Sequence, residues 1–159
     1  MSVQPTNRQP SVGVGTAAPE LEPTGWVNSQ PFRLADLRGR VTLVEFWTFD
    51  CINCQRVMPA LMQWYQAYAA RGLVIVGVHT PEFRHERELS NVQAAVQRFG
   101  IQYPVMLDND LGTWLAYRAR AWPTLYLVDK RGVIRYTHVG EGSYEQTRRA
   151  IEALLAESA

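Results

Sequence analysis

The chain has 159 residues, of which 47% are hydrophobic, and this is enough for one domain with a buried core. Its 16 Lys and Arg residues against 15 Asp and Glu residues leave a formal net charge of +1, which gives no support for a nucleic-acid partner. No apolar run reaches the length of a membrane span, and residues 1–8 lack the layout of a signal peptide. Taken literally, the sequence predicts a cytoplasmic protein.

The first third of the chain contains few regular elements. Residues 1–18 are rich in Pro, Ser, Thr, Gly and Gln, and we expect a flexible segment ahead of one domain over 19–159. The stretch 26–34 predicts a short β-hairpin around a polar turn. Residues 34–39 predict a single helical turn that ends at a glycine. The apolar run 41–47 predicts a buried strand.

The only two cysteines, Cys51 and Cys54, follow that strand as a Cys-x-x-Cys pair. A helix pattern begins there, so Cys51 lies where unpaired backbone N–H groups and the helix dipole favour a thiolate. Cys54 lies one turn further on and can attack a mixed disulfide formed by Cys51. This placement is typical of thiol–disulfide chemistry.

The helix after the cysteines carries a broad apolar face at helical spacing, which predicts packing against the sheet. Asp50 can cap its N-terminus by accepting from the backbone N–H of Ile52 or Asn53. Pro59 lies inside the helix, lacks a backbone N–H and should kink it. The apolar run 73–78 then predicts a second buried strand of the kind found in parallel sheets.

The second half of the chain alternates between helices and strands. We expect a helix over 85–99, a short helix over 110–118, a hairpin with strands 124–128 and 133–139, and a last helix over 143–157. This order predicts an α/β fold, in which a central mixed sheet is flanked by helices on both faces.

Several motifs resemble the thioredoxin fold, and they lie in the expected order: Phe46-Trp47, the Cys-x-x-Cys pair, Pro59, and Trp122-Pro123-Thr124 before a hairpin. The lead-in 34–41 and a helical insertion before the second proline are similar to the TlpA/ResA group. Further segments resemble the thioredoxin-like domain of DipZ-type proteins, namely Phe46-Trp47-Thr48, Cys51-Ile52-Asn53-Cys54, Val78-His79-Thr80-Pro81-Glu82-Phe83, Leu107-Asp108-Asn109-Asp110 and Gly140-Glu141-Gly142.

The resemblance assigns roles to individual residues. It implies that Cys51 attacks and Cys54 resolves, with no cofactor besides the redox-active Cys51–Cys54 disulfide. It implies that Pro123 is a cis-proline that faces the disulfide, rather than a trans residue in a loop. The backbone of Trp122 would hold an extended substrate segment, and Trp47 is a further candidate for substrate contact.

Glu45 lies six residues before Cys51, where thioredoxins carry a buried acid. Alternation along the strand places it on the same face as Leu43 and Trp47. A carboxyl group in a core is costly to ionise, so burial should raise the pKa of Glu45. We expect it to take the proton from Cys54 when that thiol attacks. The alternative is a partly solvated glutamate without a role.

Four residues around the cysteines are expected to tune the site. Asp50 places a carboxylate beside Cys51, where it opposes the thiolate and competes for the helix N–H groups, so we expect a more reducing protein. Ile52 and Asn53 replace the Gly-Pro of thioredoxin, and by resemblance this pair adjusts the redox potential. Pro59 shapes the helix that carries both sulfur atoms.

The residues leave three functions open. The first is a thiol–disulfide oxidoreductase that reduces protein disulfides. The second is a peroxiredoxin-like peroxidase, because Thr48 and Cys51 have Thr-x-x-Cys spacing and Arg118 or Arg120 could stabilise a thiolate. Against it, Val44 stands where that family has a proline. The third is a metal-binding or haem-maturation thiol chaperone that holds copper through both thiolates.

The residues and the resemblance also lead to expectations about metal binding, partners and cellular compartment. The histidines His79, His85 and His138 do not pair at ligand spacing, so we expect no metal. The expected partners are protein disulfide or dithiol substrates and an upstream thiol reductant, and we expect no nucleic-acid partner. We also expect no membrane span and a monomeric protein. DipZ-type relatives are extracytoplasmic, so by resemblance a chain trimmed of its leader belongs outside the cytoplasm.

Overall fold

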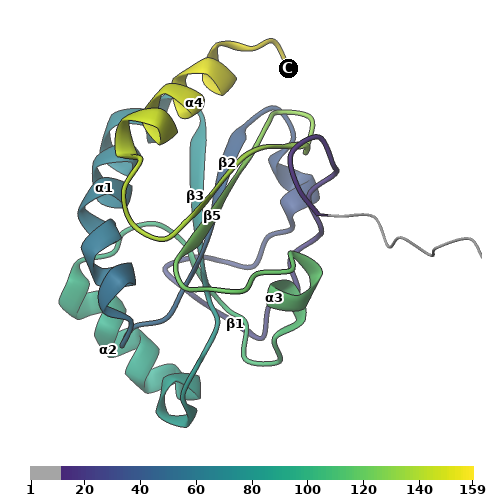
Figure 1. Ribbon diagram of the computed structural model, residues 1–159. Coiled ribbons are helices and arrows are strands. Elements are labelled where there is room, and N and C mark those ends of the chain that lie inside the picture. The colour runs from purple at the N-terminus through teal and green to yellow at the C-terminus, as the bar shows by residue number, and fades with distance from the viewer. Residues whose placement is uncertain (1–11) are drawn as a thin grey trace, which may run out of the picture.

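A six-stranded mixed sheet with the order β1-β4-β3-β2-β5-β6 lies at the centre of the protein (Figure 1). The computed structural model describes residues 12–159. Its strands are β1 (Gly25–Val27), β2 (Val41–Trp47), β3 (Leu73–His79), β4 (Val105–Leu107), β5 (Thr124–Val128) and β6 (Ile134–Val139). Its helices are α1 (Ile52–Tyr68), α2 (Leu89–Phe99), α3 (Gly112–Ala116) and α4 (Tyr144–Ala156), with 3-10 turns η1 (Leu34–Leu37), η2 (Ala69–Arg71) and η3 (Arg84–Arg87). The expected central mixed sheet is confirmed.

Three strand pairings bring four loops to one end of the sheet. β2 runs parallel to β3 and places Trp47 beside His79. β3 runs parallel to β4 and places His79 beside Leu107. β5 runs antiparallel to β2 and begins at Thr124, beside Phe46. The loops after β2, β3 and β4 therefore meet the loop that precedes β5.

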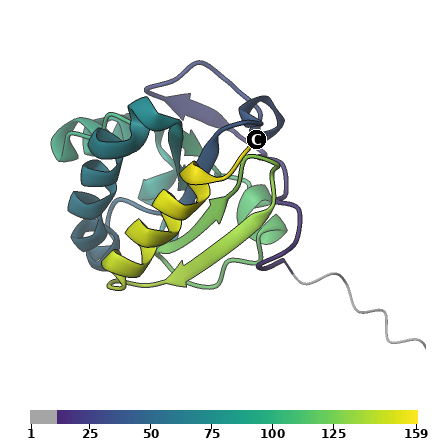
Figure 2. The same ribbon diagram turned by 90° about the horizontal axis from the view of Figure 1, so that it is seen from above.

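Both faces of the sheet are covered, which explains why β2 is buried along its whole length. α1, α2 and α4 cover one face, and Leu43 and Trp47 belong to that core (Figure 2). Val44 and Phe46 belong to a second core on the other face, beneath α3 and the segment before β2. Because side chains alternate along a strand, Glu45 points to the α1 side.

The expected hairpin over 26–34 is wrong, because β1 pairs with β4. This pairing is antiparallel and sets Trp26 beside Met106. The side-chain amide of Asn28 then donates to the carbonyl of Ile101 at 2.8 Å, across 73 positions of sequence. A local pattern cannot show such a pairing, and the sequence does not predict β4, which has only three residues.

The expected helix over 85–99 consists of two elements. The turn η3 ends at Arg87, Glu88 has an extended backbone with ψ 122°, and α2 begins at Leu89. Glu86, within η3, is completely buried.

The end of the segment 1–18, which the sequence predicts to be flexible, lies against β6. The backbone N–H of Gly15 donates to the carbonyl of Ile134 at 2.8 Å, and the N–H of Ile134 donates to the carbonyl of Thr16 at 2.9 Å. This piece of chain is therefore bound to β6 by backbone hydrogen bonds. The rest of the prediction, for residues 1–11, lies outside the described residues.

α1 is the longest of the described helices, with 17 residues. Pro59 lies inside it, as expected, and the helix continues beyond it to Tyr68. No helix within residues 12–159 is long and apolar enough to cross a membrane.

Candidate active site

Cys51 and Cys54 lie at the strand–helix junction that the sequence predicts, and both thiols are free. Cys51 is the N-cap residue of α1, and its Sγ accepts from the backbone N–H of Cys54 at 3.2 Å. Cys51 is partly exposed, whereas Cys54 is completely buried. One sulfur atom is therefore accessible from solvent and lies against a helix N–H, and the other is shielded behind it.

The expected cap by Asp50 is wrong. The Cys51 sulfur occupies the N-cap position, and the carboxylate of Asp50 contacts the ring Nε2 of His85 instead. Both Asp50 and His85 are about half exposed. The Asp50 carboxylate therefore does not compete for the helix N–H group that reaches Cys51.

Pro123 directly precedes β5, and the Trp122–Pro123 bond is cis, which confirms the predicted isomer. The Trp122 carbonyl lies 3.9 Å from the Sγ of Cys51. The Trp122 indole N–H donates to the carbonyl of Thr80 at 2.9 Å, and its ring stacks on Trp114 with centroids 4.3 Å apart. The residue expected to hold substrate is thus fixed on both sides and adjoins the reactive sulfur.

Glu45 lies below the cysteines and is only 1% exposed, so its predicted burial is confirmed. Burial raises the pKa of Glu45 well above its usual range, and its Oε1 has no hydrogen-bond partner within residues 12–159. Burial also raises the pKa of the Cys54 thiol, and its hydrogen bond with Cys51 and the nearby Glu45 raise that pKa further. Both groups therefore resist ionisation, and the Glu45 carboxylate adds to the cost of ionising Cys54.

Tyr103 closes the space around these two groups. It is 1% exposed, and burial raises the pKa of its hydroxyl, as do Glu45 and Cys54. Gly77 lies opposite Glu45 in the sheet. A Cβ at Gly77 would lie 2.9 Å from the Nε1 of Trp47 and 3.2 Å from the Cε2 of Tyr103, so only glycine leaves room for these rings.

Trp47 does not reach the surface. It is 1% exposed, and its ring packs edge-on against His79 with centroids 4.9 Å apart. The expectation that Trp47 contacts substrate is therefore wrong, because β2 directs it into the α1 core.

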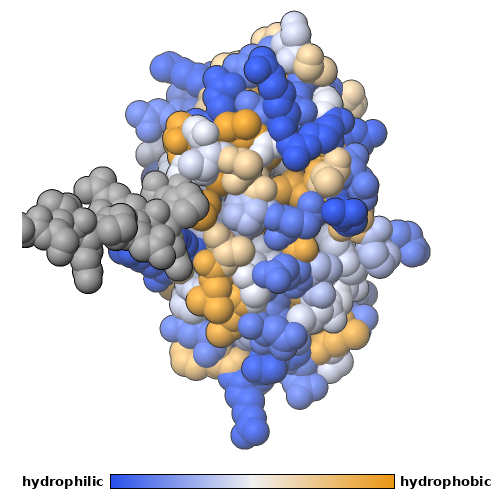
Figure 3. Space-filling view, turned by 90° about the vertical axis from the view of Figure 1, so that its right-hand side faces the viewer, coloured by the Kyte–Doolittle hydropathy of each residue, from blue (hydrophilic) through white to orange (hydrophobic). Residues whose placement is uncertain are grey.

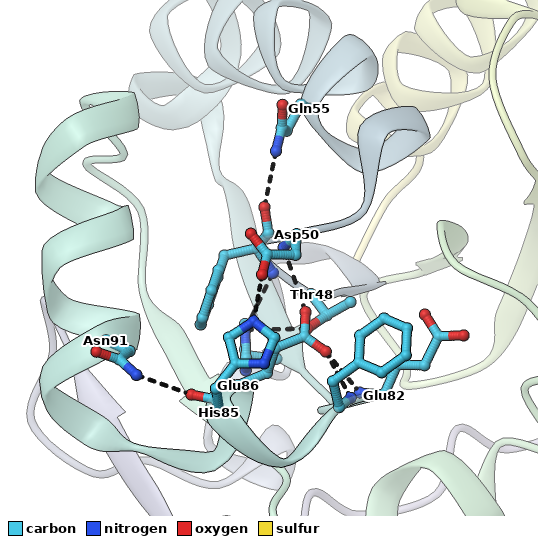
Figure 4. A network of polar contacts seen from close by, with 10 residues as sticks. Thr48, Asp50, Gln55, Glu82, His85, Glu86 and Asn91 are labelled. Carbon is cyan, nitrogen blue, oxygen red and sulfur yellow. Dashed lines mark hydrogen bonds and ion pairs between the residues drawn. The ribbon is translucent and has the colours of Figure 1, made fainter.

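A buried carboxylate holds the loop that leads into Cys51 (Figure 4). Glu86 is 0% exposed and accepts from the hydroxyl of Thr48 and from the backbone N–H of Asp50 at 3.2 Å. It also accepts from the backbone N–H groups of Glu82 at 3.0 Å and Phe83 at 2.7 Å. One side chain thus joins the loop after β2 to the segment after β3.

His79 holds the same loop from beneath. Its Nε2 accepts from the backbone N–H of Phe49 at 3.2 Å, and the two rings stack with centroids 5.5 Å apart. Burial lowers the pKa of His79 to about 4, so the ring is neutral at neutral pH. The side-chain amide of Gln55 donates to the carbonyl of Phe49 at 2.9 Å (Figure 4).

Sequence reasoning missed Glu86, His79 and Tyr103 as parts of this site. Glu86 lies in a charged run, which usually indicates a solvated surface, and its partners in the loop before Cys51 are 36 and 38 positions away. Ile52 and Asn53 are exposed between the cysteines, and their effect on the redox potential stays a prediction. Within residues 12–159, no group of three His, Cys, Asp or Glu side chains is arranged to hold a metal ion.

Residues 14–137 match the AhpC/TSA family. The chain belongs to the AhpC/TSA family. The crystal structure of a thioredoxin-like superfamily protein superposes on this AhpC/TSA chain with TM-score 0.84 and 31% sequence identity. The match covers 90% of this chain and 98% of the other protein. A crystal structure of a putative thiol:disulfide interchange protein DsbE from Chlorobium tepidum gives TM-score 0.79 at 25% identity, over 92% of this chain and all of the other. The expected thioredoxin fold is confirmed.

Two curated relatives support the resemblance to DipZ and ResA. Protein DipZ from Mycobacterium tuberculosis is 46% identical over 142 residues, which make up 87% of this chain and 20% of DipZ. The thiol-disulfide oxidoreductase ResA from Geobacillus kaustophilus is 29% identical over 144 residues, 91% of this chain and 79% of ResA. The chain therefore spans about a fifth of the length of the DipZ proteins that it matches.

Proposed function

We propose that this chain is a thiol–disulfide oxidoreductase that reduces disulfide bonds of proteins. The observation that carries the proposal is the sulfur pair at the start of α1. Cys51 is partly exposed beneath the Trp122 carbonyl, and Cys54 is buried one turn further along the helix. The names of ResA and DsbE, which describe the same exchange chemistry, support the proposal.

In the first step, the Cys51 thiolate attacks one sulfur atom of the substrate disulfide. The Cys51–substrate S–S bond forms, the substrate S–S bond breaks, and the departing thiolate takes a proton. The backbone N–H of Cys54 donates to the Cys51 sulfur and so holds the attacking atom at the start of α1.

In the second step, Cys54 loses its proton and attacks the Sγ of Cys51. The Cys51–Cys54 disulfide forms, the mixed disulfide breaks, and the second substrate thiolate leaves, so two electrons pass from the protein to the substrate. Glu45 supports this step because a carboxylate with a raised pKa is a stronger base. We propose that Glu45 accepts the Cys54 proton.

A further dithiol must reduce the Cys51–Cys54 disulfide before the next cycle, and we propose an upstream thiol reductant for this step. Both cysteines, Glu45 and Trp122 come from one chain, so a monomer contains all the groups that the cycle uses.

The test uses the fully reduced protein and a protein disulfide such as that of insulin. We expect two substrate thiols to appear for each Cys51–Cys54 disulfide that forms. Cys54→Ser should accumulate a mixed disulfide at Cys51, visible as an added mass that a reducing agent removes. If Cys51→Ser reduces the substrate as fast as the native chain, the proposal is wrong.

The peroxidase alternative receives less support from the site. Its Thr-x-x-Cys signature requires the Thr48 hydroxyl near Cys51, but that hydroxyl donates to Glu86. Arg118 and Arg120 are both exposed beyond α3. Rapid consumption of peroxide by the reduced protein, with oxidation of Cys51 to a sulfenic acid, would favour the peroxidase over the disulfide reductase.

A further inference from the structure

A hollow of about 630 Å³ adjoins the active site and takes no part in the chemistry described above. It lies between the segment after β3 and the loop after β4. Its lining consists of Pro81, Glu82, Phe83, Arg84, Arg87, Asn109 and Leu111. Figure 3 shows one side of the molecule, on which apolar and hydrophilic side chains lie next to one another.

Two connections place the hollow close to Cys51. Pro81 follows Thr80, whose carbonyl accepts from the indole of Trp122, and the Trp122 carbonyl adjoins the Cys51 sulfur. On the other side, Glu86 accepts from the backbone N–H groups of both Phe83 and Asp50. A substrate segment that leaves Trp122 in extended form advances about 3.3 Å per residue, so a few residues of chain link the two places.

The walls of the hollow are held in place without a ligand. Asp108 is completely buried and accepts from the hydroxyl of Thr80 at 2.7 Å and from the backbone N–H groups of Thr113 at 2.9 Å and Trp114 at 3.0 Å. Glu86 fixes the opposite wall at Phe83. Two buried carboxylates therefore shape the hollow in advance, which lowers the entropic cost of binding.

The lining combines exposed apolar side chains with unpaired positive charge. Phe83 is 54% exposed and Leu111 is 39% exposed. Arg84 and Arg87 form no ion pair within residues 12–159, and Glu82 is the one acidic residue among the lining residues. Guanidinium groups bind carboxylates through paired N–H donors, so the site suits a ligand with one apolar and one anionic group.

We propose that this hollow binds the part of a protein substrate that lies next to its reactive cysteine, and that it selects a segment with an acidic side chain beside an apolar one. The inference rests on the proposed function and names a substrate class for the same site. Phe83 and Leu111 contact the apolar side chain, and Arg84 and Arg87 bind the carboxylate.

The test compares three peptides that carry the same disulfide and the same leucine, and differ only in a Glu, Gln or Lys four residues from the reactive cysteine. The rate constant for reduction by the fully reduced protein is measured for each peptide. We expect the Glu peptide to react about threefold to tenfold faster than the Gln peptide, and the Lys peptide to react more slowly than both. The difference should shrink in 0.5 M salt, where exposed charges are screened.

Substitutions assign the preference to the hollow. In a double variant, Arg84→Gln with Arg87→Gln, the ratio of Glu to Gln rates should fall to about one. Arg40→Gln is the matched control, because Arg40 is an exposed arginine at the opposite end of β2, and it should keep the ratio. The ratio is read only for variants whose thermal unfolding matches that of the native chain.

Each outcome separates this inference from the proposed function. Equal rates for the three peptides, in a protein that reduces all of them, overturn the acidic preference and leave the oxidoreductase intact. A preference that survives in the double arginine variant, or that is unchanged in 0.5 M salt, also overturns it. Failure to reduce any of the peptides, or a small uncharged disulfide, contradicts the proposed function itself.

Discussion

The backbone N–H of Asp50 donates to the buried carboxylate of Glu86 at 3.2 Å, so a side chain from η3 holds the residue that precedes Cys51. The other partners of this carboxylate are the Thr48 hydroxyl and two backbone N–H groups of the segment after β3. All of these groups donate. A glutamine at position 86 would place its own N–H₂ against a donor and leave it unsatisfied.

Glu86→Gln should therefore lower the free energy of unfolding by about 1–3 kcal/mol, the usual cost of an unsatisfied buried polar group. Denaturant unfolding followed by tryptophan fluorescence measures this difference. Glu88→Gln is the matched control, because Glu88 is an exposed neighbour, and it should change stability by less than about 0.5 kcal/mol. Equal stability of the Glu86 and Glu88 variants would show that the network in Figure 4 is not what holds the loop.

Glu45→Gln should slow the second step of disulfide exchange, because glutamine cannot accept the Cys54 proton. General base catalysis commonly contributes about 100-fold or more, so the mixed disulfide at Cys51 should persist for far longer. Quenched-flow mass spectrometry measures its lifetime. The first step, attack by Cys51, should keep its rate, and a variant that slows both steps equally would assign Glu45 to structure alone.

The same variant should be more stable than the native chain at neutral pH. Burial raises the folded-state pKa of Glu45 above its ordinary value of 4.5. The contribution of Glu45 to the unfolding free energy is therefore complete below pH 4.5 and is lost as the pH rises through the folded-state pKa. Glu45→Gln removes this loss. Its advantage in unfolding free energy should be absent near pH 4 and grow toward pH 8, and a constant difference across this range would contradict the assignment.

His79 should make stability depend on pH in the opposite direction, with a loss as the pH falls. Its pKa is about 4 in the folded chain against 6.5 in a model compound, so the unfolded chain binds the proton more readily. The contribution of His79 to the unfolding free energy is complete above pH 6.5 and falls by about 3 kcal/mol as the pH drops toward 4. His79→Gln should flatten this slope in pH-dependent urea unfolding. His138→Gln, at a more exposed position, should retain it.

Gly77→Ala should destabilise the protein by about 1–3 kcal/mol, because the new Cβ meets the Nε1 of Trp47 at 2.9 Å in a closely packed core. Gly25→Ala is the matched control in another strand, since its Cβ would meet only side-chain atoms of Leu107 at 3.7 Å and beyond. Thermal unfolding should separate the two variants clearly. Similar midpoints would mean that the Trp47 ring shifts at little cost.

The features that the sequence predicts correctly depend on short stretches of chain. The buried strand before Cys51, the burial of Glu45 and the cis bond before Pro123 each follow from a local pattern or a motif. Strand alternation was enough to place Glu45 on the α1 side. These features have few alternatives once the Cys-x-x-Cys pair is located.

The features that the sequence does not reveal depend on distant partners. The sequence predicts that Asp50 caps the helix N-terminus, but its carboxylate contacts His85, 35 positions away. β1 pairs with the three-residue strand β4 in the second half of the chain, and residues 26–34 form no hairpin. A charged run gives no sign that Glu86 alone is buried, because its burial depends on how the segment after β3 folds over the loop before Cys51.

At the end of the sheet, one piece of chain supplies the groups for disulfide exchange and another supplies the groups proposed to bind substrate. Residues 41–54 supply both sulfur atoms and Glu45, whereas 80–123 supply the hollow and Trp122. The electron-carrying pair could therefore stay the same while the second piece is exchanged for that of a relative with another target. Such an exchange must keep Glu86, because its carboxylate joins the second piece to the first through hydrogen bonds from Thr48 and Asp50.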